Sequence, residues 1–177
     1  MIELEKTVDL LPAEIKFFDF IKGSDFPWFY QASTYNFHMT CHTFMRRNEN
    51  APNDRGIANS QFLPVAESIF MRVCRDNGVK VKTLYRLAVN ATEASAHARG
   101  DLHVDQGSHK HRVFLLYLNE FSDGSTYVYL NDDYEPYEVK AAPFKAVVFD
   151  GELHAQGFCR VGERRLVFVA TFNPRDE

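Results

Sequence analysis

The sequence lacks the features that assign a protein to several common functional classes. No run of Lys and Arg exceeds two residues, and the net charge is −4, so the basic surface of a nucleic-acid-binding protein is not expected. No apolar stretch approaches the roughly 18 residues that cross a membrane, and residues 1–6 carry no secretory h-region. Neither a Gly-rich phosphate loop nor a G-x-S-x-G nucleophile motif is present. We therefore expect neither a nucleic acid nor a membrane as a partner.

Cysteine is also scarce. The three residues Cys41, Cys74 and Cys159 are an odd number and form no C-x-x-C pair. This pattern is typical of free thiols in a reducing compartment, so we expect a cytoplasmic protein. None of the three lies in a context that suggests a nucleophile, and packing is the expected role of Cys159.

The apolar residues that are present predict one α+β domain over residues 1–177, with β-structure dominant. Helical spacing of apolar side chains predicts helices over residues 12–23 and 60–77. Residues 32–46 have the composition of a strand, and residues 47–56 that of an exposed loop. After residue 78 the pattern changes to short strands separated by turns, at 79–90, 112–118, 126–130, 137–139, 146–149 and 166–172. We predict a jelly-roll core over 79–174 with helical N-terminal support over 1–78.

A short motif in the middle of the chain suggests a metal site. His103 and Asp105 are two residues apart, so on a strand both side chains point to the same side and can reach one metal ion. His154 follows the predicted strand 146–149 and is the candidate third ligand. Two imidazoles and one carboxylate form the facial triad of non-haem Fe(II) oxygenases, which leaves open positions for co-substrate and O2. Taken alone, an H-x-D motif is also compatible with a hydrogen-bonded surface pair.

A basic residue follows at a matching distance. Arg164 lies ten positions after His154, at the start of the apolar strand 166–172, where its guanidinium could bind the distal carboxylate of 2-oxoglutarate. The neighbouring Arg165 would point to the opposite side of the strand, so one of the two can face the co-substrate. The offset from His154 favours Arg164, and Arg165 is the alternative.

These motifs, in this order, resemble the 2-oxoglutarate/Fe(II)-dependent dioxygenases, in particular the small bacterial or phage-borne members of the prolyl 4-hydroxylase-like branch. The resemblance covers roughly residues 79–174. It rests on His103-Val104-Asp105, Leu116-Tyr117-Leu118-Asn119, Asp123-Gly124-Ser125-Thr126, the segment 148–154 that ends in His154, and Gly162-Glu163-Arg164. The turn at 123–126 departs from the Gly-Gly-x-Thr pattern of the family by one glycine.

The resemblance implies a double-stranded β-helix that holds Fe(II) through His103, Asp105 and His154. It also implies that Arg164 and the hydroxyl of Tyr117 bind 2-oxoglutarate, and that O2 is the oxidant. The activity implied is hydroxylation of a C–H bond, with a peptidyl proline favoured and a free amino acid or other small metabolite as the alternative. A non-catalytic jelly-roll module that binds a ligand is the alternative from another class. The partner would be a peptide, protein or small-molecule substrate, and the sequence carries no signal for oligomeric state.

Other polar residues receive structural assignments. His109 and His111 form an H-x-H pair, but the next glutamate is too distant for a cupin-type metal site, so we expect them in the loop after the metal strand. His38 and His42 lie in a predicted strand and are expected to be structural. Asn90 shares a strand face with Arg86; we favour contact with solvent over contact with the site. The small, polar segment 91–101 is a candidate lid.

Overall fold

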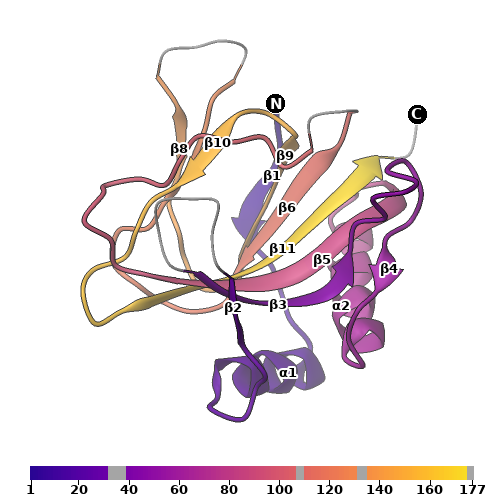
Figure 1. Cartoon of the computed structure of the whole chain (residues 1–177), viewed down its shortest axis with the longest axis horizontal. Coiled ribbons are helices and arrows are strands. Elements are labelled where there is room, and N and C mark those ends of the chain that lie inside the picture. The colour runs from indigo at the N-terminus through magenta and orange to yellow at the C-terminus, as the bar shows by residue number, and fades with distance from the viewer. Residues whose placement is uncertain (32–38, 107–109, 131–134, 175–177) are drawn as a thin grey trace.

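The protein is built from two antiparallel β-sheets and two helices (Figure 1). The computed structural model describes residues 1–31, 39–106, 110–130 and 135–174. In chain order the elements are β1 (Ile2–Thr7), α1 (Pro12–Lys22), β2 (Phe29–Gln31), β3 (Met39–Arg46), β4 (Ile57–Ala58), α2 (Leu63–Asp76), β5 (Val81–Glu93), β6 (Arg112–Tyr117), β7 (Thr126–Val128), β8 (Tyr137–Val139), β9 (Lys145–Asp150), β10 (His154–Gln156) and β11 (Arg164–Pro174).

The two sheets differ in size and face each other. The larger one has the strand order β1-β9-β6-β11-β5-β3-β2, with β4 paired to β3, and the smaller one has the order β10-β7-β8. β11 is central because it pairs with β5 on one side and with β6 on the other. The arrangement is a double-stranded β-helix, which confirms the predicted fold class.

Alternation along β11 divides the interior into two layers. Leu166, Phe168 and Ala170 point to one side and pack against the helices. Val167 and Val169 point to the other side and pack between the two sheets. Each strand residue therefore belongs either to the helix layer or to the inner layer, and odd-numbered positions of β11 are the inner ones.

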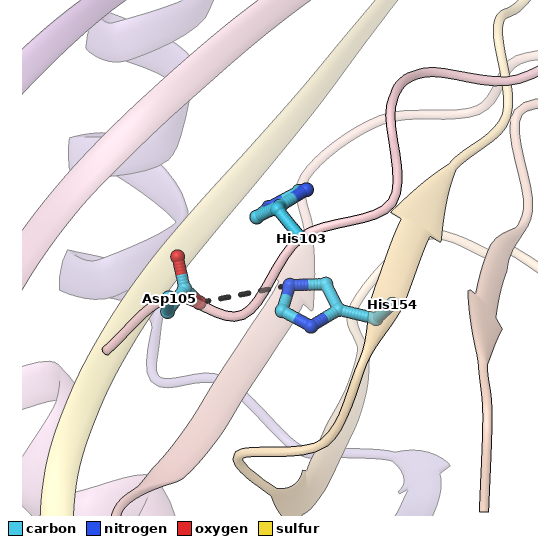
Figure 2. Close-up of side chains that lie close together, drawn as sticks. All are labelled: His103, Asp105 and His154. Atoms are coloured by element: carbon cyan, nitrogen blue, oxygen red, sulfur yellow. Dashed lines mark ion pairs between the residues drawn. The ribbon is translucent and has the colours of Figure 1, made fainter. Parts of the chain in front are cut away.

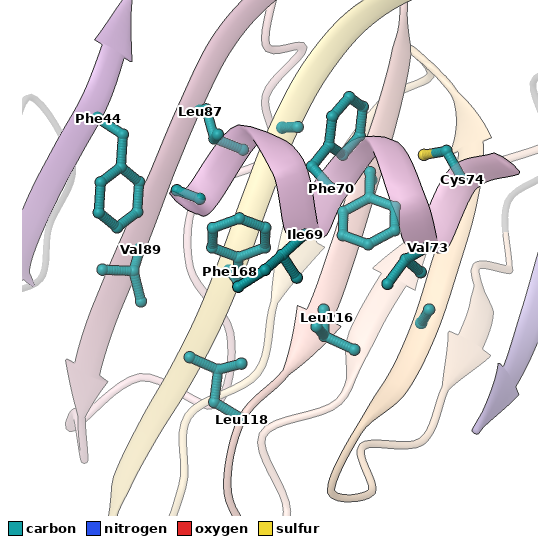
Figure 3. Close-up of a cluster of buried hydrophobic side chains, with 14 of the residues drawn as sticks. Phe44, Ile69, Phe70, Val73, Cys74, Leu87, Val89, Leu116, Leu118 and Phe168 are labelled. Carbon is teal, nitrogen blue, oxygen red and sulfur yellow. The ribbon is translucent and has the colours of Figure 1, made fainter. Parts of the chain in front are cut away.

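The helix layer contains most of the aromatic core. Ile69, Phe70 and Val73 of α2 project toward the large sheet and meet Phe168 and other side chains of its outer face (Figure 3). Full burial of each such side chain contributes roughly 1.5–3 kcal/mol of transfer free energy. This layer fixes the position of β11, whose other face lines the inner layer.

The two helices are joined by an ion pair. The Glu14 side chain accepts a hydrogen bond from the backbone N–H of Leu11 at 2.8 Å, which caps α1. The same carboxylate accepts from Arg72 Nε on α2 at 2.6 Å. Among the described residues, neither helix combines the length and the apolar composition that a membrane crossing requires.

Several element boundaries differ from those predicted. α2 begins at Leu63 and not at Ser60, whose hydroxyl accepts a hydrogen bond from the Phe62 N–H and lies 2.8 Å from His42 Nε2. Strand β1 was not predicted, and four strands lie before residue 79 beside the two helices. Of the predicted strand 32–46, residues 39–46 form β3, and residues 32–38 lie outside the described part of the chain.

Candidate metal centre

Three potential metal ligands converge at one end of the inner layer (Figure 2). One ligand-type atom from each of His103, Asp105 and His154 lies within 4.8 Å of the other two. His103 and His154 are held together by two backbone hydrogen bonds of 3.0 Å, in which the N–H of each donates to the carbonyl of the other. Asp105 Oδ2 lies 3.7 Å from His154 Nε2. One backbone bridge thus joins two residues that are 51 positions apart in the sequence.

Both imidazoles are held in the orientation that a metal ligand needs. His103 Nδ1 lies 3.0 Å from the carbonyl oxygen of Asp101, and His154 Nδ1 lies 2.8 Å from that of Glu152. A carbonyl only accepts, so each Nδ1 carries the proton and donates it. Each Nε2 then keeps its lone pair for a metal ion, as in other proteins where a backbone carbonyl orients a ligating histidine. The donor set therefore fits a divalent ion that prefers imidazole and carboxylate.

The charge states of the ligands also suit metal binding. Burial lowers the pKa of the His154 imidazole below its ordinary value, despite the opposing attraction of Asp105. Burial by itself raises the pKa of the Asp105 carboxyl, but electrostatic attraction by neighbouring groups outweighs this effect and holds the pKa below its ordinary value. The attracting groups are His154, Arg86, His103 and Arg47. A neutral imidazole and an ionised carboxylate are the forms that bind metal.

A small cavity adjoins the three ligands. Its volume is about 60 Å³, several times the roughly 10–15 Å³ that one water molecule needs. Beside the candidate ligands, the polar side chains that line it are Arg86, Asn90, Thr126, Gln156 and Arg165. The cavity therefore presents both a metal-binding end and groups for a polar ligand.

The two adjacent arginines occupy opposite faces of β11, and the structure places Arg165 in the cavity lining, whereas the sequence favoured Arg164 for that position. Arg165 lines the cavity, and its side chain is buried. Its Nε donates to the Gly124 carbonyl at 2.9 Å and a terminal nitrogen donates to Thr126 Oγ1 at 3.0 Å. Arg164 shares the face of Leu166; its guanidinium donates to Thr40 Oγ1 at 3.0 Å and lies 5.0 Å from the centre of the Trp28 ring. Alternation along the strand explains the difference, since residue 165 is odd and therefore inner.

Arg165 has no acidic partner among the described residues, although it is buried. Burial lowers its pKa, while Tyr117 opposes this effect. A buried guanidinium without a counter-ion costs several kcal/mol. An anion that enters the cavity would supply the missing charge.

Tyr117 lies next to Arg165 and Thr126. Its buried hydroxyl lies 2.7 Å from Thr126 Oγ1, and its ring centre lies 5.5 Å from the Arg165 guanidinium. The structure thus places Tyr117 beside Arg165, and its hydroxyl is hydrogen-bonded to Thr126. Thr126 was not selected from the sequence as a site residue, although it belongs to the turn that carries the resemblance.

The remaining sequence candidates are distributed as follows. Asn90 lines the cavity, so the favoured assignment to solvent was wrong. His42 is structural: its ring nitrogens lie 2.8 Å from the Pro27 carbonyl and 2.8 Å from Ser60 Oγ. His111 is buried beside Gly151, where an added Cβ would lie 2.3 Å from the imidazole.

Two histidines and three cysteines remain among the residues considered from the sequence. His38 and His109 lie outside the described residues. Cys41, Cys74 and Cys159 are buried and free, in agreement with the packing role predicted for Cys159.

Comparison with known proteins identifies the fold. No protein-family model matches the chain, and no curated protein matches it either. It is similar to an oxidoreductase of the 2OG-Fe(II) oxygenase family from Burkholderia pseudomallei, with a TM-score of 0.73 and 14% identity over 93% of this chain and 81% of that one. A prolyl-4-hydroxylase from Pseudomonas putida gives a TM-score of 0.57 and 17% identity over 98% and 92% of the two chains.

A third similar structure contains a peptide. It is a prolyl hydroxylase from Trichoplax adhaerens in complex with a fragment of the hypoxia inducible factor oxygen degradation domain, with a TM-score of 0.50 and 12% identity over 76% and 62% of the chains. At these identities the three similarities establish a shared fold, which is that of 2-oxoglutarate/Fe(II) oxygenases.

Proposed function

We propose that this protein is a 2-oxoglutarate- and Fe(II)-dependent dioxygenase that hydroxylates a C–H bond of its substrate. One observation carries the proposal. The cavity beside His103, Asp105 and His154 contains a buried arginine, Arg165, that no described carboxylate neutralises. A metal-binding end and an anion-binding group in one small cavity match the two ends of 2-oxoglutarate. The shared fold supports the same assignment.

Each side chain has a role in this proposal. His103, Asp105 and His154 would hold Fe(II), and Arg165 would hold the distal carboxylate of 2-oxoglutarate through charge-assisted hydrogen bonds. Thr126 and Tyr117 orient that guanidinium through the contacts described above. When bound, the ion and co-substrate would supply the oxidising chemistry, in which one oxygen atom of O2 enters succinate, formed with CO2 from 2-oxoglutarate, and the other enters the hydroxyl group of the product.

The substrate we favour is a peptidyl proline. Two of the similar structures are prolyl hydroxylases, and one of them contains a peptide. A free amino acid or another small metabolite is the second candidate, and the small cavity volume is consistent with it. Mass spectrometry of a peptide library after incubation with Fe(II), 2-oxoglutarate and O2 separates these candidates, because hydroxylation adds about 16 Da (one oxygen atom) to the product.

Metal and co-substrate binding can be tested without turnover. Mn(II) and N-oxalylglycine, an analogue of 2-oxoglutarate, should raise the melting temperature of the wild-type protein. At a ligand concentration of about 100 Kd the stabilisation is about 2.7 kcal/mol, which corresponds to roughly 5–10 °C for a chain of this size. No shift at saturating ligand would favour a non-catalytic module instead.

The metal ligands are tested by substitution. Asp105→Ala should weaken Mn(II) binding by at least about 100-fold, since loss of an outer hydrogen-bond partner alone costs about 10–100-fold. Asp101→Asn is the matched control, because Asp101 is exposed and meets His103 through its backbone carbonyl. Equal metal affinities of the two variants, measured by calorimetry, would reject the ligand assignment.

A further inference from the structure

Two further arginines lie on the side of the metal centre that carries Asp105. Arg47, just after β3, places a terminal nitrogen 3.7 Å from Asp105 Oδ1. Arg86, on β5, lines the cavity and attracts the same carboxylate. Asp105 Oδ2, the other oxygen, faces His154. The carboxylate thus has one oxygen toward the other candidate ligands and one toward a cation.

The strand pairing places Arg86 and Arg165 at opposite ends of the inner face. Arg165 pairs across to Thr92, whereas Arg86 pairs across to Thr171. Thr92 follows Arg86 by six positions along β5, which is about 20 Å of extended strand. A 2-oxoglutarate molecule anchored at Arg165 and directed toward the metal ligands would therefore leave the Arg86 end of the cavity for another molecule.

Charge balance indicates what that molecule carries. The described lining of the cavity, with Arg47 beside it, contains three arginines and one carboxylate, Asp105. The two positive charges of a divalent ion and the two negative charges of 2-oxoglutarate cancel, so arginines still outnumber carboxylates among these described groups. Positive charge in a partly dehydrated site is stabilised when a bound ligand brings an anion.

Arg47 is also positioned to take part. Its Nε is buried and has no hydrogen-bond partner among the described residues, and its side chain is 36% exposed. The guanidinium is therefore held at Asp105 by one terminal nitrogen while other donors stay available. A planar carboxylate can accept two parallel hydrogen bonds from such a group.

We infer that the substrate carries a carboxylate close to the carbon that is hydroxylated, and that Arg86 and Arg47 bind it. The inference rests on the proposed function. Because both arginines adjoin Asp105, the carboxylate and the reacting carbon are separated by only a few bonds. Two sources share this chemistry: the α-carboxylate of a free amino acid, and the side chain of an acidic residue next to the hydroxylated proline of a peptide.

The experiment compares matched acids and amides. Wild-type protein is incubated with Fe(II), 2-oxoglutarate and O2 and with each of the free amino acids, their C-terminal amides, and N-acetylated, amidated dipeptides in which proline adjoins Asp, Glu, Asn or Gln. Succinate release and product mass are measured. We expect one acid to be turned over at least about 10-fold more efficiently than its amide, the effect of losing one charge-assisted hydrogen bond. A preferred free amino acid would identify an α-carboxylate as the recognised group, and a preferred peptide would identify an acidic side chain.

Variants link the preference to the arginines. Arg86→Gln and Arg47→Gln should reduce the acid-to-amide ratio of kcat/KM toward one, whereas Arg46→Gln, which removes the same charge from an exposed neighbour, should keep the wild-type ratio. A merely structural role of Arg47 at Asp105 would lower turnover of acid and amide alike and leave the ratio unchanged.

Three outcomes would overturn the inference. In the first, acids and amides are turned over equally well. In the second, the acid-to-amide ratio is unchanged in both Arg86→Gln and Arg47→Gln. In the third, no acid increases succinate release although the wild type binds Mn(II) and N-oxalylglycine. An increase in the KM for 2-oxoglutarate in Arg86→Gln, with the substrate ratio intact, would assign Arg86 to the co-substrate instead. Failure of the wild-type protein to bind N-oxalylglycine would reject the proposed function itself.

Discussion

Replacement of Arg165 by methionine should separate co-substrate binding from stability. The buried guanidinium lies in the cavity and is held by the Gly124 carbonyl and Thr126 Oγ1. Removing the cationic member of a buried charge pair costs about 2–5 kcal/mol of binding free energy. At about 1.4 kcal/mol per tenfold, the affinity for N-oxalylglycine should fall by about 30-fold to several thousand-fold. Binding to the Mn(II)-loaded protein is measured by calorimetry.

The same substitution should have little effect on the protein without ligands. It removes two hydrogen bonds of about 1 kcal/mol each, but it also removes the desolvation cost of a buried charge that has no acidic partner among the described residues. The melting temperature of the ligand-free variant should therefore stay within a few degrees of that of the wild type. Arg165→Lys keeps the charge but loses the planar fork, so its affinity should be intermediate.

The matched control is Arg164→Gln. This partly buried side chain contacts Thr40 and Trp28 on the other face of the strand. The affinity for N-oxalylglycine should therefore change by less than about threefold, as expected for a charge that does not contact the ligand. A large loss of affinity in Arg164→Gln together with wild-type affinity in Arg165→Met would refute the inward orientation of Arg165 and restore the residue favoured by the sequence.

Three further substitutions test the anion site and the packing of the rest of the fold. Tyr117→Phe should weaken N-oxalylglycine binding by about 2–10-fold, the net contribution of one hydrogen bond; wild-type affinity in the same titration would show that its hydroxyl does not support the anion site. Gly56→Ala should lower the free energy of unfolding by at least about 1–3 kcal/mol, because the new Cβ would lie 2.2 Å from the Tyr85 carbonyl oxygen; an unchanged urea midpoint would contradict this packing. Glu14→Gln should cost about 1.5–3 kcal/mol by loss of the charged hydrogen bond from Arg72, and thermal unfolding that matches the wild type would show that this ion pair is not needed.

The three candidate metal ligands could be selected from the sequence because their geometry is local or follows from strand ends. His103 and Asp105 need only an extended backbone to share a side, and His154 needs only to follow a strand. The bridge between His103 and His154 required the structure, since pairing between distant segments is not encoded in spacing. The assignment of these residues to iron stays a prediction until a metal is measured.

The choice between Arg164 and Arg165 could not be made from the strand alone. Leu166, Val167 and Phe168 are all apolar, because β11 is buried on both faces, by helices on one side and by the small sheet on the other. Such a strand has no polar–apolar alternation, so its sequence does not show which face is inner. The choice was made instead from the number of residues between His154 and the arginine. That count selected Arg164, one residue before the arginine that lines the cavity, and a shift of one residue along a strand moves a side chain to the opposite face.

β1 was missed for a related reason. Its residues are a mixture of charged and apolar types at the edge of the large sheet, where only part of one face is buried. The ion pair between Arg112 and Glu3 and the bonds of the Met1 amino group to Asp150 and Glu152 fix it in place. Charged residues are common on edge strands, and they weaken the sequence signal there.

Hydrogen bonding in the inner layer gives a reason to expect a ligand that does not depend on similarity to other proteins. Asn90 Oδ1 and Gln156 Nε2 are buried, line the cavity and have no hydrogen-bond partner among the described residues. Arg165, in the same cavity, has no described counter-ion. Buried polar groups of native proteins are nearly always paired, and each exception costs about 1–3 kcal/mol. An unpaired amide oxygen, an unpaired amide nitrogen and an uncompensated guanidinium around one cavity together exceed what a purely structural core would retain. An anionic occupant would accept from the Gln156 amide nitrogen and the Arg165 guanidinium, whereas Asn90 Oδ1 is an acceptor and needs a donor such as water or a substrate N–H. The two imidazoles and the carboxylate at the other end of the cavity supply the site for the cation that the anion accompanies.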